Sequence, residues 1–291
     1  RCMRRRSSII LLSKTKMSSM PRYIFYIWCS LAYVFLLSPL VIVAGASLHR
    51  GSRYTVVQFP PTELSLYWYT QIPEAHWEAL SLSFGLGFLS AFLACCLGIP
   101  AALGLVRSRI KCKALISSLI RAPMQIPTIV TGLAFLQMYY LFGDLTGLYA
   151  HGTFVGLLLA HLFVGIPYVV GTVVAVLQRF DSRLEEAALS LGASRWRTFR
   201  RVTLPVIMPG VYAGGLYAFM VSFGDVPISM LLSVPGYVTY PVELFYGMEN
   251  DFNPAVLASS TIVIFLSLGV MLVMQRLIGL ENLLRSDGNR N

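Results

Sequence analysis

Residues 182–205 read SRLEEAALSLGASRWRTFRRVTLP. Ser182 and Glu185 have the spacing of a capping box, which predicts the start of a helix because the two side chains can bond to free backbone N–H groups there. Apolar residues then recur at i, i+3, i+4 and i+7, which predicts one apolar stripe along the helix. The stripe consists of Leu184, Ala187, Ala188 and Leu191.

A second short helix is predicted after a glycine turn. Gly192 stands where a residue in the left-handed conformation would end the first helix, and Ser194 is placed to cap the second. Pro205 is expected to end that second helix. Its apolar side comprises Trp196, Phe199 and Val202, and its basic residues are Arg195, Arg197, Arg200 and Arg201.

An apolar stripe on a short helix needs something to cover it, and three interpretations are open. The helix pair can lie on a membrane or pack against its own protein. It can instead dock in a groove of a soluble partner, as amphipathic helices often do. A DNA-binding helix-turn-helix is the third interpretation, and it is disfavoured because both ends of the segment lead within a few residues into long apolar stretches.

Those flanking stretches belong to a chain built for a membrane. Hydrophobic residues make up 56% of the 291 positions and charged residues 12%, against about a quarter charged in a soluble domain. A helix of about 20 apolar residues crosses the hydrocarbon core, so the sequence predicts an all-α membrane protein with six transmembrane helices. The predicted spans are Tyr23 to Leu48, Trp77 to Val106, Leu115 to Leu141, Thr153 to Leu177, Val206 to Ser233, and Ala255 to Ile278.

The net charge of +10 follows the membrane topology and does not indicate nucleic acid. Of the 23 Lys and Arg residues, all but Arg50 and Arg53 lie ahead of the first span, around the junction of the second and third, between the fourth and fifth, or at the end of the sixth. The positive-inside rule places these segments, and both termini, in the cytoplasm. The opposite segments hold Glu63, Glu74, Glu78, Asp144, Glu243, Glu249 and Asp251.

Three regions follow from this topology. Residues 1–22 are a basic cytoplasmic segment, residues 23–280 are the six-helix domain with its cytoplasmic loop 178–205, and residues 281–291 are a cytoplasmic tail. The first span follows a basic segment as a signal peptide does, but its apolar stretch is longer than a signal peptide requires. We expect it to be retained as an anchor.

The loop resembles the EAA loop of ABC-importer permeases. Glu186-Ala187-Ala188 is followed after three residues by Gly192, and then by Val202 and Leu204-Pro205 at that loop's spacing, with Val202 where Ile is usual. The segment 191–194, Leu-Gly-Ala-Ser, also fits. In the first outer loop, Phe-Pro-Pro at 59–61 and Ser-Leu-Tyr-Trp-Tyr at 65–69 resemble the spermidine/putrescine-type permeases.

This resemblance implies the permease of a type I importer in the bacterial cytoplasmic membrane. Two such subunits, in this subfamily usually two different but related chains, would form the pathway. Two separate ATPase subunits would bind ATP and Mg, and an external solute-binding protein would deliver the substrate. Coupling to the ATPase is implied for the loop residues Glu185, Glu186, Ala187, Ala188, Leu191, Gly192, Ala193, Ser194, Leu204 and Pro205.

A polyamine-like cation is the substrate that the resemblance implies first, with opines, amino-acid derivatives, phosphonates and iron chelates as alternatives. Asp225, inside the fifth span, is one candidate pathway residue because acids at membrane depth usually face a cavity. Asp225 can equally cap a helix that restarts at Pro227. Tyr168 and Gln137 are further pathway candidates, whereas His161 among apolar neighbours is expected to be packed and hydrogen-bonded.

No catalytic or metal site is predicted. The chain has no Gly-Lys pair and therefore no P-loop for ATP, and its five cysteines lack metal-ligand spacing. Two other classes are weighed against the permease. A membrane-embedded enzyme would need a catalytic motif in the spans, and a self-contained secondary transporter would be expected to show more buried charge and often an internal repeat.

Overall fold

A computed structural model describes residues 22–50, 58–109, 111–250 and 254–287, and these are almost entirely helical. The 3-10 turns are η1 (Tyr67–Thr70) and η2 (Ala122–Met124), and η3 (Phe199–Thr203) is a π-helical turn. The α-helices are α1 (Arg22–Ala46), α2 (Glu74–Arg107), α3 (Lys113–Arg121), α4 (Thr128–Thr146), α5 (Phe154–Leu177), α6 (Arg183–Ser190), α7 (Arg195–Thr198), α8 (Leu204–Phe223), α9 (Pro227–Leu232), α10 (Tyr240–Asn250) and α11 (Ala255–Asp287).

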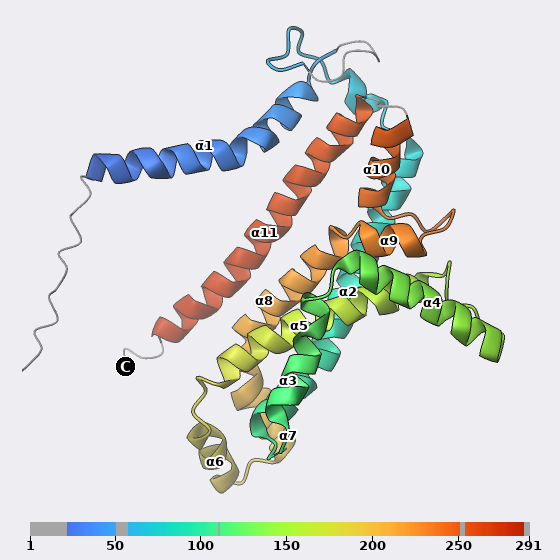
Figure 1. The fold of residues 1–291 in the computed structure, drawn as a ribbon. Coiled ribbons are helices and arrows are strands. Elements are labelled where there is room, and N and C mark those ends of the chain that lie inside the picture. The colour runs from blue at the N-terminus through green and yellow to red at the C-terminus, as the bar shows by residue number, and fades with distance from the viewer. Residues whose placement is uncertain (1–21, 51–57, 110, 251–253, 288–291) are drawn as a thin grey trace, which may run out of the picture.

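Helices α2, α5 and α8 pack closely together and form the centre of the molecule (Figure 1). Small residues permit this approach. A Cβ atom at Gly214 of α8 would lie 2.7 Å from the Cα of Val169 in α5, which is closer than packed atoms tolerate. At Gly98 of α2 a Cβ would lie 2.8 Å from a methyl group of the same Val169. Val169 is fully buried, so the three helices meet around it.

The described helices include five that are long and apolar enough to cross a membrane, and a sixth span if α3, η2 and α4 count as one. The segment predicted as the third span, Leu115 to Leu141, is broken, and its two halves meet at 97°. Pro127 explains the break. It has no N–H group to continue a helix, and it disfavours the helical conformation of Ile126 before it.

The predicted fifth span is also interrupted. Helix α8 ends at Phe223 and α9 begins at Pro227, so the segment from Val206 to Ser233 has the break near Pro227 that was one of its two predicted forms. At its other end the helical path extends beyond the prediction, from Arg195 through η3 into α8. Proline at 227 is again tolerated only as the start of a new helix.

Helix α1 leaves the bundle and extends away from it (Figure 1). None of its most apolar window is buried in the chain, and large side chains such as Phe35 and Tyr33 are 77% and 65% exposed. It contacts α11. Such a surface is not stable in water, so lipid or another chain must cover it.

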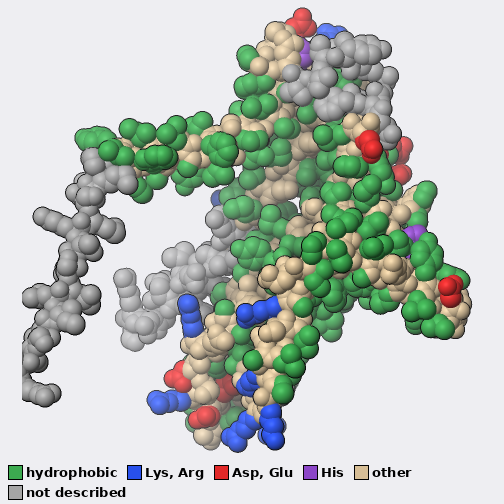
Figure 2. Space-filling view, viewed as in Figure 1, with side chains coloured by type: hydrophobic (Ala, Val, Ile, Leu, Met, Phe, Trp, Pro, Cys, Tyr) green, Lys and Arg blue, Asp and Glu red, His purple; other side chains and the backbone are tan. Residues whose placement is uncertain are grey.

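The charges are distributed unevenly along the molecule. Figure 2 shows Lys and Arg side chains gathered at the end formed by α3, α6 and α7, with a large apolar surface between this end and the other. This agrees with the charge asymmetry in the sequence.

Candidate functional site

The predicted helix–glycine turn–helix is present between α5 and α8, but its first cap differs from the prediction. Asp181 Oδ1 accepts a hydrogen bond from the backbone N–H of Arg183 at 3.0 Å. Ser182 makes no side-chain cap bond and is itself helical, with φ −62° and ψ −19°. A capping side chain needs extended backbone at its own residue, so the predicted capping box of Ser182 and Glu185 is wrong.

The Glu185 side chain turns toward the bundle instead. Its Oε1 accepts hydrogen bonds from the guanidinium of Arg107, at the end of α2, and from the hydroxyl of Thr203 in η3. Neither Arg107 nor Thr203 was singled out from the sequence. They lie 78 and 18 positions from Glu185, and no local pattern indicates that they meet.

The glycine turn is confirmed. Gly192 has φ +84°, its N–H donates to the Leu189 carbonyl at 3.0 Å, and the Ala193 N–H donates to the Ala188 carbonyl at 3.1 Å. These two bonds form a Schellman motif, which satisfies the last carbonyls of α6. A glycine is required there because the left-handed conformation is costly for other residues.

The second helix begins as predicted but does not end as predicted. Ser194 Oγ accepts a hydrogen bond from the Arg197 N–H at 3.3 Å, which is an N-cap. Pro205 was expected to end the helix, yet the chain continues through η3 into α8, with Pro205 in the first turn of α8. The π-helical turn changes the hydrogen-bond partners just before this proline, and a first turn tolerates the missing N–H.

The apolar stripe of α6 is exposed. Leu184 is 53% exposed and Leu191 is 89% exposed, and no residue of α6 is buried. On α7, Trp196 is 68% exposed, and its ring centroid lies 5.6 Å from that of Phe199. Packing of this stripe against its own bundle is therefore excluded within the part of the chain that the structure describes.

The pathway candidate Asp225 lies in the break between α8 and α9. It is 8% exposed, and its Oδ2 accepts a hydrogen bond from the Ser229 N–H at 2.9 Å. The carboxylate therefore caps α9, which was one of its two predicted roles.

His161 of α5 contacts the helices on both sides of the same break. One ring nitrogen lies 2.9 Å from Ser222 Oγ and the other 3.1 Å from Ser229 Oγ. With only 2% of its surface exposed, His161 is packed and hydrogen-bonded, as predicted. Together with Asp225, it joins α5, the end of α8 and α9 through buried polar contacts.

The other two pathway candidates are not brought together with Asp225. Tyr168 of α5 is partly buried, and its ring stacks on that of exposed Tyr217 in α8, with centroids 6.2 Å apart. Gln137 is exposed on α4. No hydrogen bond or ring contact among the described residues joins any two of these three candidates.

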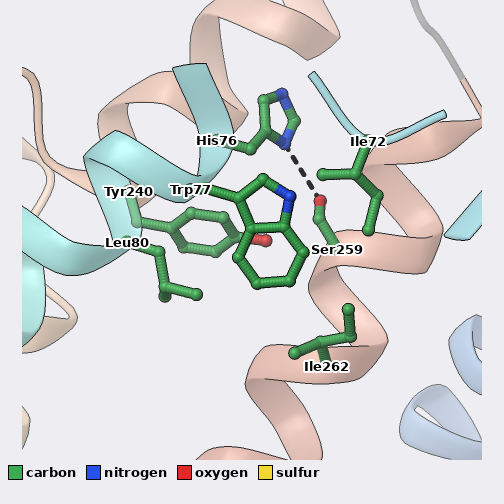
Figure 3. Close-up of a pocket in the computed structure, with 7 residues that line it drawn as sticks. All are labelled: Ile72, His76, Trp77, Leu80, Tyr240, Ser259 and Ile262. Carbon is green, nitrogen blue, oxygen red and sulfur yellow. Dashed lines mark hydrogen bonds between the residues drawn. The ribbon is translucent and has the colours of Figure 1, made fainter. Parts of the chain in front are cut away.

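The hollows of the described chain differ in size and lining, and one of about 160 Å³ between α2 and α10 is lined by Glu78 and Glu243 among others. Another lies at the junction of α2, α10 and α11, where His76 of α2 bonds to Ser259 of α11 at 3.1 Å (Figure 3). Its volume is about 10 Å³, the lower limit for one water molecule. A larger hollow of about 450 Å³ between α2, α8 and α11 is lined almost entirely by apolar side chains. No cluster of three metal-ligating side chains occurs among the described residues.

Solved structures with this fold are ABC transporters. A bacterial ABC transporter that imports the acidic polysaccharide alginate matches with a TM-score of 0.67 at 14% identity, covering 89% of this chain and 95% of that one. The MetNI methionine ABC transporter matches with a TM-score of 0.57 at 17% identity, covering 75% and 99%. At these identities the likeness establishes the fold.

Relatives found by sequence comparison are more similar to this chain than these solved structures are. The spermidine/putrescine transport system permease protein PotC of Haemophilus influenzae is 32% identical over 245 residues, which is 84% of this chain and 91% of that protein. The putrescine transport system permease protein PotI of Escherichia coli is 30% identical over 237 residues, or 80% and 83%. The family model for binding-protein-dependent transport system inner membrane components matches residues 94–280. The chain belongs to this family of membrane permeases.

Proposed function

We propose that this ABC-importer permease subunit couples to separate ATPase subunits through residues 178–205 and carries a polyamine-like cation across the bacterial cytoplasmic membrane. The observation that carries the coupling role is the open stripe of α6. Leu184 and Leu191 are exposed on a helix whose end is fixed by Gly192, and such a face suits a groove in a soluble partner. The arginine-rich end of the molecule faces the cytoplasm, where that partner lies.

The transport step needs partners that bias a conformational equilibrium. ATP and Mg bind to the partner ATPase subunits, whose closure moves the loop and switches the bundle between inward and outward openings. A ligand shifts such an equilibrium only if it binds the two states with different affinity, and here ATP has this role. An external solute-binding protein delivers the substrate to the opposite side.

A second, related permease completes the pathway. In support, no hydrogen bond or ring contact among the described residues joins any two of the candidates Asp225, Tyr168 and Gln137, and the hollow of about 450 Å³ is lined almost entirely by apolar side chains. A cation pathway needs polar groups that replace water around the solute. The polyamine-like substrate is supported by PotC and PotI, whose names state spermidine/putrescine and putrescine.

The test is purification of the chain from its native membrane in mild detergent, with mass spectrometry of what is retained. We expect a P-loop ATPase and a second permease, and we expect Gly192→Asp to lose the ATPase because a Cβ at this left-handed position strains the turn that orients α6. Gly147→Asp is the matched control, since Gly147 is also left-handed, at φ +77°, with open space around its Cα. A chain that is recovered alone and still transports would overturn the proposal in favour of a secondary transporter.

A further inference from the structure

The contacts of Glu185 connect three elements at the arginine-rich end of the molecule. The Glu185 carboxylate on α6 is bonded to the guanidinium of Arg107, which ends α2, and to the hydroxyl of Thr203, which ends η3. Arg107 Nη2 also lies 3.5 Å from Thr203 Oγ1. Each of the three side chains therefore touches the other two.

In this cluster Glu185 and Thr203 face the bundle, whereas the Arg107 side chain is 41% exposed, and the leucines of the α6 stripe face away from the bundle. The Glu185 side chain is 17% exposed, and Thr203 is fully buried. The next residue, Glu186, is exposed, because successive helical positions point about 100° apart. The two adjacent acids thus have different surroundings, and only Glu186 is free to meet a partner protein.

Thr203 lies at a distinctive place in the backbone. It is the last residue of η3, where the Leu204 N–H donates to the Phe199 carbonyl in the π-helical pattern. Isolated π-helical turns often mark functional sites. The Glu185 cluster therefore joins α6 both to the end of α2 and to the entrance of α8, two of the three helices at the centre of the bundle.

We propose that Arg107, Glu185 and Thr203 are positioning residues that hold α6 at a fixed orientation to α2 and α8, so that movement of α6 moves both helices. The inference rests on the proposed coupling of residues 178–205 to an ATPase. Without the ion pair, α6 still docks on its partner through the exposed leucines, but it turns on its connections at 178–182 and 191–194. ATP is then hydrolysed without a matching movement of the bundle.

The experiment uses the complete complex, with its ATPases, second permease and binding protein, reconstituted in liposomes. Spermidine uptake and ATP hydrolysis are measured together for wild type, Glu185→Gln and Arg107→Gln. We expect the ATPase subunits to remain bound and the spermidine transported per ATP to fall about fivefold, at the lower end of typical coupling between linked sites. Arg109→Gln is the matched control, since Arg109 is exposed nearby and is not part of the cluster.

Two further measurements separate positioning from simple stability. The double variant Arg107→Glu with Glu185→Arg restores the ion pair with reversed charges, and we expect it to recover much of the transport-to-hydrolysis ratio. Amide exchange in α8 reports movement without any transported solute. In wild type, the amide exchange rates of residues 204–223 are expected to differ between samples with and without ATP and vanadate. In Arg107→Gln this difference is expected to disappear.

The outcomes distinguish this inference from the function on which it rests. If both single variants transport as much spermidine per ATP as wild type, and if nucleotide still changes amide exchange in α8, this inference is overturned but the proposed function is not. Loss of the ATPase subunits from Glu185→Gln also overturns it, since Glu185 would then contact the partner, while the coupling role of the loop stands. A wild-type complex without any ATPase overturns both.

Discussion

At the residue scale, function depends on where single polar groups are bonded. Asp225 was predicted either to face a pathway or to cap a helix, and its bond to the Ser229 N–H shows the cap. Glu185 was expected to cap α6 and bonds to Arg107 instead. In both cases the carboxylate accepts hydrogen bonds from groups of its own chain. Each acid therefore fixes the position of a helix.

The cap at Asp225 gives a prediction with two variants. Asp225→Ala removes the acceptor for the Ser229 N–H and is expected to cost about 1 kcal/mol of stability. Asp225→Asn keeps an oxygen at the same place and is expected to remain near wild type in stability and in polyamine uptake. Thermal unfolding in detergent and uptake in liposomes check both. Loss of uptake in Asp225→Asn, with unchanged stability, would show instead that the carboxylate charge acts on the solute.

The close approach of α5 and α8 gives a second prediction. Gly214→Ala places a Cβ 2.4 Å from Thr172 Oγ1 and 2.7 Å from Val169 Cα, so the helices must separate, at an expected cost of about 1–3 kcal/mol. Gly171→Ala on α5 is the control, because nothing lies within 4 Å of its Cβ position. Thermal unfolding in detergent is the measurement, and equal melting temperatures for the two variants would contradict the expected packing.

At the element scale, the informative units are α6 and the two broken spans. Helix α6 exposes its apolar side, which suits the docking role that we propose for it, and it is too short to be stable without its neighbours. The breaks at Gln125–Pro127 and at Gly224–Val226 divide long apolar segments into pieces with different directions. Polar backbone groups exposed by such breaks are tolerated at membrane depth only where protein or water covers them.

The docking face of α6 can be tested without changing the fold. Leu191→Ala is expected to leave thermal stability unchanged, because Leu191 is 89% exposed, and to weaken ATPase binding by about tenfold, as loss of a central interface residue does. Leu145→Ala is the control, since Leu145 is 77% exposed on α4. Binding is measured by titrating the purified permease pair with ATPase subunits. Equal affinities for the two variants would exclude the stripe as the docking face.

At the scale of the whole molecule, charge and exposure are those of a protein that lies in a membrane. Basic side chains gather at one end, and α1 is unburied along its apolar length. The positive-inside rule predicts that the arginine-rich end faces the cytoplasm. Cys112, exposed next to α3, is therefore expected to react with an impermeant maleimide only after the cells are opened. A Leu64→Cys variant, at the opposite end, is expected to react in intact spheroplasts. The reverse pattern would invert the topology.

Local sequence patterns predicted much of this structure, and the features that they did not predict have physical causes. Gly192 and Ser194 act through bonds within a few residues, so their roles were readable from the sequence alone. Pro127 and Pro227 were visible too, but whether proline bends or breaks a helix depends on packing against other elements. The Arg107–Glu185 contact was not predictable, because it joins residues 78 positions apart.

The continuous helical path from Arg195 to Phe223 has a mechanical consequence. Its 29 residues span roughly 43 Å at 1.5 Å per residue, with the arginine-rich loop at one end and the Asp225 cap at the other. Such a rod acts as a lever. A tilt of about 5° about its loop end displaces the far end by roughly 4 Å, about 0.7 of the helical pitch. Under the proposed coupling, a small rotation at the ATPase becomes a movement of this size at the Asp225 end of the helical path.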